Sequence, residues 1–188
     1  MLQSELASVR NQPDRQWNAG RNRSGCRSSH GFTISIPEAL SLGAALARPD
    51  PRLAGLLLYY GAFGLADSAS RRLHGGEVDG LSPEDLAFYR DSYLARPEDR
   101  QDLRYDCLSA ELGGLPPCFI GAVDLDPLRD DSLALAEALR LAGVPHRLRV
   151  YHGVLHGFLH YSRTLPLAAA ALAEGGHFIT ERLALREA

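Results

Sequence analysis

The chain has 188 residues, which is enough to bury one hydrophobic core and form one domain. Hydrophobic residues make up 45% of it, as in a typical soluble globular protein, and no apolar run approaches the roughly 18 residues of a membrane-spanning helix. The formal net charge is −3, and the basic residues, all of them arginine, form no basic stripe. Composition and charge therefore exclude a nucleic-acid-binding protein and a membrane protein.

The N-terminal residues lack the basic start and apolar stretch of a signal peptide, so we expect a cytoplasmic protein. The cysteines Cys26, Cys107 and Cys118 agree with that compartment, because they are odd in number and far apart in the sequence. This spacing indicates neither a disulfide framework nor a zinc site.

Residues 1–36 differ in composition from the rest of the chain. They are rich in Arg, Asn, Gln, Ser and Gly, and such a segment buries too little apolar surface to order itself. At its end, Phe32, Ile34 and Ile36 alternate with polar residues, which indicates a short strand. We predict a non-homologous or disordered segment at 1–36 and a folded domain at 37–188.

The first half of the folded domain has a helix, a strand and a second helix. Pro37 suits the first position of a helix over residues 37–48. The apolar run LAGLLLYY at 53–60 is typical of a parallel strand covered on both faces. A Gly-rich connection follows at 61–81, and the capping box SPED at 82–85 begins the second helix.

The second half continues this alternation. PCFIGAV at 117–123 and HRLRVY at 146–151 are the expected strands, and Pro127 begins the helix between them. The last helix spans 165–185, where two adjacent glycines weaken its middle. Alternating strands and helices predict an α/β fold, a parallel sheet with crossover helices.

Two ionisable side chains follow neighbouring strands of this sheet. Asp126 comes after the strand that ends near Val123, and His156 comes after the strand that ends near Tyr151. Since ligands bind beyond the carboxyl ends of parallel strands, both side chains reach the same edge. There a carboxylate can orient an imidazole, which then acts as general base and acid.

Other interpretations of these residues stay open at this point. Asp126 also suits a helix cap, with His156 as a loop residue. Asp124 competes with Asp126 for the role of the acid, whereas Asp130 and Asp131 favour the N-terminus of the following helix electrostatically.

Two further histidines flank His156 at a spacing of four residues. His152 and His160 are interpreted as surface residues or as supports of the site, since Gly153 and Gly157 indicate a loop. No acidic ligand accompanies the three histidines in a recognised spacing, so we expect no metal site.

The segment LPPCFIGAVDLDPLRDDSLALAEALRLAGVPHRLRVYHGVLHGFLHYSR resembles the C-terminal part of the α/β-hydrolase superfamily. Within it, the DPLRD and HGF motifs are similar to those of hormone-sensitive-lipase-like carboxylesterases. The segment LAGLLLYYGAFGLADSASRRLHGGEVDGLSPEDLAFYRDSYL looks like bacterial acetyl esterase. The resemblance implies a partial α/β-hydrolase domain at 37–188, with its N-terminal strands missing. It also implies Ser-His-Asp hydrolysis of short-chain acyl esters without a cofactor, with Asp126 as the acid and His156 as the base.

The family's nucleophile elbow, Gly-x-Ser-x-Gly, and its HGGG-type oxyanion loop have no clear counterpart upstream. By spacing, the nucleophile falls near Ser29, where Arg27 replaces the first glycine of the elbow. LADSASR at 65–71 and LHGGE at 73–77 imitate the two motifs, but both lie after the apolar strand and not before it.

Three functional hypotheses follow from this pattern. In the first, the chain is an inactive fragment of an acetyl-esterase-like enzyme. In the second, it is an esterase with an unconventional nucleophile, either Ser29 or a serine of the Gly-rich connection. In the third, it is a non-catalytic binding module or half of a split hydrolase. The expected partner is a small-molecule short-chain acyl ester, and the chain is expected to self-associate through an exposed sheet edge.

Overall fold

Three parallel strands with helices on both faces form the part of the chain that the computed structural model describes, residues 36–76 and 79–187. The main elements are, in chain order, α2 (Ile36–Ala47), β1 (Leu56–Tyr59), α3 (Ala69–Leu73), α4 (Pro83–Tyr93), β2 (Cys118–Leu125), α5 (Arg129–Leu141), β3 (His146–Leu155) and α6 (Pro166–Glu187). Three 3₁₀ turns lie between them, η1 (Pro97–Gln101), η2 (Cys107–Ser109) and η3 (Phe158–Tyr161).

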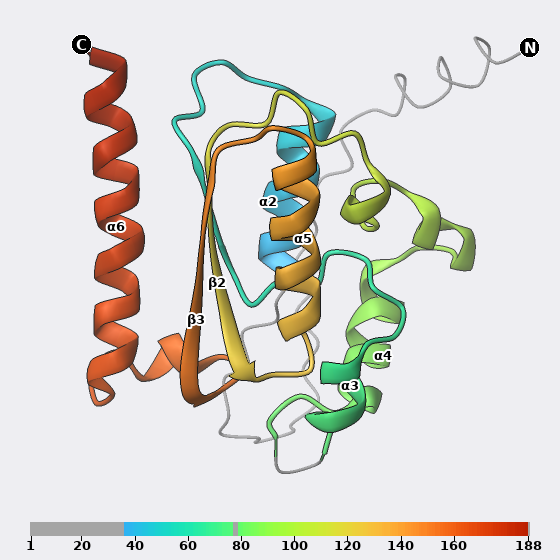
Figure 1. The fold of residues 1–188 in the computed structure, drawn as a ribbon. Helices are drawn as coiled ribbons and strands as arrows, with labels where there is room; N and C mark the ends of the chain where they lie inside the picture. The colour runs from blue at the N-terminus through green and yellow to red at the C-terminus, as the bar shows by residue number, and fades with distance from the viewer. Residues whose placement is uncertain (1–35, 77–78, 188) are drawn as a thin grey trace, which may run out of the picture. The chain divides into compact units, whose positions relative to one another are not determined.

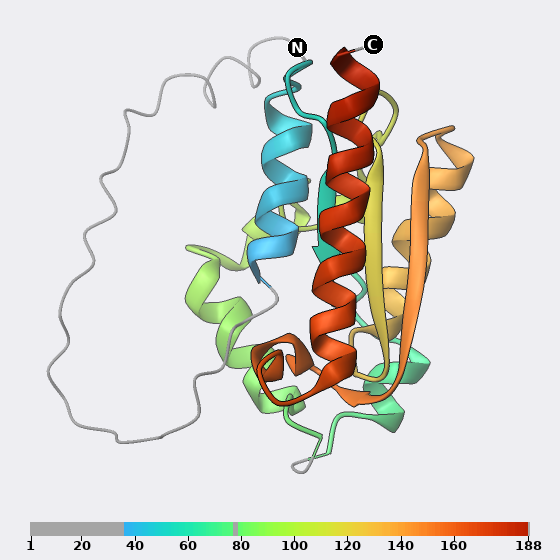
Figure 2. The same ribbon diagram turned by 90° about the vertical axis from the view of Figure 1, so that its left-hand side faces the viewer.

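The strand order is β1-β2-β3, and both pairs are parallel. Helices α2 and α5 cover one face of the sheet and α6 covers the other (Figures 1 and 2). The central strand β2 is accordingly buried along most of its length. This arrangement confirms the predicted α/β fold with crossover helices, because α5 connects β2 to β3 across one face.

Side chains alternate along β1 between two apolar clusters, as the pleat of a strand requires. Leu56 and Leu58 pack in the cluster with α2 and α5. Tyr59 packs with Phe119 and Phe178 in the second cluster, under α6. The sheet therefore has a buried layer on each face.

Several predicted boundaries differ from the structure. Ile36 begins α2 and does not end a strand. The rest of the predicted strand lies outside the described residues, as does nearly all of the segment 1–36. Strand β1 is shorter than the apolar run 53–60, and β3 extends to Leu155. Helix α3 lies within the Gly-rich connection, where no helix was predicted, because Ser68 caps it locally.

The capping box that begins α4 is confirmed in both of its hydrogen bonds. Ser82 accepts a hydrogen bond from the Asp85 amide at 3.1 Å, and Asp85 accepts one from the Ser82 amide at 3.0 Å. In the described residues no helix is both long and apolar enough to cross a membrane.

Helix α6 approaches the sheet closely at Gly175. The Tyr59 hydroxyl donates a hydrogen bond to the Ala171 carbonyl at 2.6 Å, and a Cβ at position 175 would overlap that hydroxyl. Gly176 has no neighbour within 4 Å of such a Cβ. Helix propensity treats the two glycines alike, but only Gly175 lies where a side chain would meet the sheet.

We predict that Gly175→Ala and Gly176→Ala have opposite effects on the free energy of unfolding. Gly176→Ala should raise it by up to about 1 kcal/mol, because alanine favours the helix. Gly175→Ala should lower it by about 1–3 kcal/mol, because the methyl group overpacks against Tyr59. Urea denaturation followed by circular dichroism measures both, and equal effects would contradict the packing described for Gly175.

Candidate active site

The pairing of β2 with β3 determines which side chains meet beyond the sheet. Val123 pairs with Tyr151 and Leu125 pairs with Leu155, so three residues of β3 stand opposite one residue of β2. This bulge restores the pairing at the end of both strands. The residue that follows β2 and the residue that follows β3 therefore lie next to each other, just beyond the ends of the two strands.

Those next residues are Asp126 and His156, and they are hydrogen-bonded. The distance between His156 Nδ1 and Asp126 Oδ2 is 2.8 Å. The Asp126 side chain is fully buried and that of His156 is 5% exposed. The other Asp126 oxygen, Oδ1, accepts a hydrogen bond from the Leu128 amide at 2.7 Å, next to the start of α5. Asp126 therefore holds the first turn of the helix and the imidazole at the same time.

This arrangement assigns a tautomer to His156. A carboxylate accepts hydrogen bonds, so Nδ1 carries a proton, and in the neutral imidazole Nε2 then has the lone pair. Nε2 is buried and has no hydrogen-bond partner among the described residues. An imidazole in this state can take a proton from a hydroxyl group and later return it.

Asp124 has a different partner and does not contact His156. Its carboxylate accepts hydrogen bonds from the Gly153 amide at 2.9 Å and from His152 at 3.1 Å. Partial burial pushes the pKa of Asp124 upward, but the hydrogen bonds from Gly153, His152 and Leu125, together with the electrostatic effect of His152, leave the pKa below its ordinary value. Gly153 lies within the bulge and has a positive φ of 73°. Since Asp124 accepts the hydrogen bond of the Gly153 amide, it stabilises the bulge from its exposed side.

The flanking histidines lie at the surface. The His152 side chain is 77% exposed and His160 is exposed too. Among residues 36–76 and 79–187, no cluster of three or more His, Cys, Asp or Glu side chains could hold a metal ion.

Asp131 has a structural role that the sequence pattern did not reveal. It is fully buried and its Oδ1 accepts hydrogen bonds from the amides of Phe63, Gly64 and Leu65 at 2.8, 3.3 and 3.3 Å. Arg71 binds the other oxygen at 2.9 Å. Burial raises the pKa of Asp131, while Arg71 and the amides act in the opposite direction. A signal existed in the sequence, since Asp131 lies four residues before Leu135 on the apolar face of α5.

The serines of the Gly-rich connection are also engaged in structure. Ser68 caps α3, and the buried Ser70 hydroxyl donates a hydrogen bond to the Pro127 carbonyl at 2.9 Å. Neither is hydrogen-bonded to His156, which disfavours both as nucleophiles. Ser29 lies outside the described residues.

The thiols offer no alternative nucleophile in the described part of the chain. Cys107 and Cys118 are buried, and burial raises the pKa of both to about 12. A thiol with this pKa is almost wholly protonated near neutral pH and reacts slowly.

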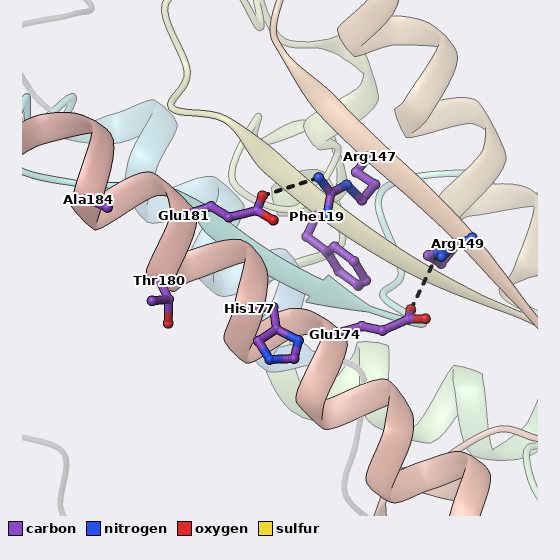
Figure 3. Close-up of a pocket in the computed structure, with 8 residues that line it drawn as sticks. All are labelled: Phe119, Arg147, Arg149, Glu174, His177, Thr180, Glu181 and Ala184. Atoms are coloured by element: carbon purple, nitrogen blue, oxygen red, sulfur yellow. Dashed lines mark hydrogen bonds and ion pairs between the residues drawn. The ribbon is translucent and has the colours of Figure 1, made fainter.

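A surface pocket of about 430 Å³ lies elsewhere, between α6 and the sheet (Figure 3). Its polar rim is formed by the ion pairs Arg147–Glu181 at 3.2 Å and Arg149–Glu174 at 3.4 Å. Neither Asp126 nor His156 lines it. Its charged groups are already paired, so we do not assign the chemistry to this pocket.

A parallel α/β sheet with a hydrogen-bonded acid and imidazole beyond its strand ends is an arrangement found in proteins with the α/β-hydrolase fold. Residues 36–160 match the family model described as alpha/beta hydrolase fold, and the chain belongs to this family.

Solved structures extend this assignment. The chain is 25% identical to an esterase from Pyrobaculum calidifontis, with a TM-score of 0.71 over 78% of this chain and 49% of that one. It is 25% identical to the carboxylesterase EstE1 from a metagenomic library, with a TM-score of 0.66 over 74% of this chain and 50% of that one. It is 31% identical to the ester-hydrolase EH1AB1 from the metagenome of Lake Arreo, with a TM-score of 0.64 over 77% of this chain and 48% of that one.

These neighbours are esterases of the hormone-sensitive-lipase-like carboxylesterase type, which confirms that part of the resemblance found in the sequence. The finer resemblance to bacterial acetyl esterase stays a prediction. The chain spans about half the length of the solved esterases that it matches.

We predict that Asp126→Ala lowers the free energy of unfolding by about 2–4 kcal/mol. The substitution leaves the Leu128 amide and His156 Nδ1 buried without an acceptor, and each such group costs about 1–3 kcal/mol. Asp124→Ala is the matched control and should cost about 1 kcal/mol or less, since its bonds lie at the surface. Chemical denaturation compares the two, and equal losses would contradict the double role of Asp126.

Proposed function

We propose that this chain carries the acid and the base of a carboxylic-ester hydrolase that acts on short-chain acyl esters, such as acetyl esters, without a cofactor. The observation that carries the proposal is the 2.8 Å contact between buried Asp126 and His156, with Nε2 of the imidazole unpartnered among the described residues. Membership of the alpha/beta hydrolase family and likeness to solved esterases support the same reaction.

In this mechanism His156 accepts a proton from a serine hydroxyl as that oxygen attacks the ester carbonyl. Asp126 keeps the proton on Nδ1 and stabilises the imidazolium that forms. His156 then returns the proton to the leaving alcohol and later activates a water molecule, which hydrolyses the acyl-enzyme.

Ser29 is the candidate nucleophile within the chain, on the basis of its spacing from β1 and the Ser-x-Gly sequence that it begins. Nucleophile, base and oxyanion donors act as a unit, so an acid and a base alone would give little rate above background. The rate of ester hydrolysis by this chain therefore reports whether a serine hydroxyl reaches Nε2 of His156.

The test is hydrolysis of p-nitrophenyl acetate by the purified chain. We expect His156→Gln and Ser29→Ala each to lower the rate by about 10²-fold or more. His152→Gln is the matched control, because His152 also contacts an aspartate but is 77% exposed, and it should leave the rate unchanged. Activity that survives His156→Gln would reject the assignment of the base.

A chain with no hydrolysis at all would favour the second candidate function, a non-catalytic module or half of a split hydrolase. The open edge of β1 favours this alternative, because β1 pairs with β2 alone among the described strands. Unpaired amides and carbonyls at such an edge can bind another strand. We propose that a second copy of the chain binds there.

We predict that the chain self-associates and that Leu57→Pro weakens the association. The Leu56 and Tyr60 amides bond to the β2 side, so in a parallel ladder the Leu57 amide points to the outer edge. Leu57→Ala removes the same side chain and keeps the amide, and it should associate like the unchanged chain. Sedimentation velocity over a range of concentrations decides, and a chain that is monomeric throughout would reject the proposal.

A further inference from the structure

Tyr60, the residue directly after β1, packs on the unexpected side of the sheet. Leu58 packs against α2 and α5, and Tyr59 packs under α6. Continued alternation would return Tyr60 to the side of Leu58. Tyr60 instead belongs to the same cluster as Tyr59 and is 5% exposed.

The cause is the backbone conformation of Tyr60 itself. Its φ is +43°, and it is the one residue other than glycine with positive φ in residues 36–76 and 79–187. Bulky side chains rarely adopt this left-handed conformation, because Cβ crowds the backbone. The Tyr60 amide still donates a hydrogen bond to the Gly121 carbonyl at 2.7 Å, so the chain turns at this residue and not before it.

The loop after Tyr60 is held in a way that maintains the turn. Asp131 accepts hydrogen bonds from the Phe63, Gly64 and Leu65 amides, and it is fixed on α5 by burial and by Arg71. Strained conformations persist where the surrounding contacts determine them in this manner. They occur frequently at functional sites.

Tyr60 contacts His156. Their ring centroids lie 4.9 Å apart at an interplanar angle of 65°, an edge-to-face arrangement. Phe158 contacts Tyr60 in the same manner at 6.1 Å. The hydrogen bond to Asp126 holds the imidazole at one atom, Nδ1. Contact with the Tyr60 ring restrains the orientation of the imidazole at a second place.

We propose that Tyr60 is a positioning residue, which uses its left-handed backbone to place an aromatic ring against His156 and so keeps the imidazole in one orientation and in the Nδ1–H tautomer. This inference rests on the proposed function in so far as His156 is the base of an esterase. The restraint itself can be measured without any ester.

The experiment is NMR spectroscopy of the full chain labelled with ¹⁵N-histidine, with His156→Gln used to identify the His156 signals. The ¹⁵N shifts of the ring distinguish the tautomers, and the exchange rate of the Nδ1 proton with water reports how firmly the ring is held. We expect Tyr60→Leu to increase that exchange rate about tenfold or more and to shift the ¹⁵N signals toward a mixture of tautomers. Tyr60→Phe retains the ring that packs against His156, so we expect its exchange rate and tautomer to stay closer to those of the unchanged chain than those of Tyr60→Leu.

Phe119→Leu is the matched control. It removes a ring from the same cluster, but Phe119 contacts Tyr59 and Phe178 and has no ring contact with His156. We expect no change in tautomer in this variant. If Tyr60→Leu does not fold, Tyr60→Gly removes the ring and accepts the positive φ without strain.

The proposal is overturned if a folded Tyr60→Leu or Tyr60→Gly chain keeps the tautomer and exchange rate of the unchanged chain. It is also overturned if Phe119→Leu produces the same change, because the effect would then reflect general packing. Failure of the proposed function is a separate result. If the tautomer depends on Tyr60 but ester hydrolysis is unaffected by His156→Gln, the positioning role stands and His156 is rejected as the base.

Discussion

The register between β2 and β3 is the constraint on which the site depends. Without the bulge in β3, the pairing of Val123 with Tyr151 would continue residue by residue and Leu125 would not meet Leu155. Asp126 and His156 would then leave the sheet at different heights. The exposed Asp124–Gly153 hydrogen bonds stabilise the bulge, so a surface contact helps to determine the geometry of a buried one.

Much of the fold was predictable because the signals are local. The capping box at Ser82, the apolar face of α5 and the apolar runs of the strands depend on residues close together in sequence, and they predict a parallel sheet with crossover helices. The meeting of Asp126 with His156 was also predictable, because parallel strands bring their carboxyl ends to one edge.

The remainder depends on contacts between distant residues. Asp131 lies 68 residues from Phe63, and no local pattern indicates that its carboxylate would hold that loop. The left-handed turn at Tyr60 has no glycine or asparagine to announce it, since tertiary contacts impose the conformation. Helix propensity alone predicts that Gly175 weakens α6, whereas the approach of the Tyr59 hydroxyl gives it a packing role.

The two oxygens of Asp126 have a consequence for how such chains evolve. One oxygen orients the imidazole and the other holds the first turn of α5, so a lineage that lost catalysis would still lose stability on replacing this residue. Selection for an adequately folded chain would then preserve the aspartate after selection for activity had ceased. His156 Nε2 has no such second duty among the described residues. In distant relatives, persistence of the histidine is therefore a better record of retained chemistry than persistence of the acid.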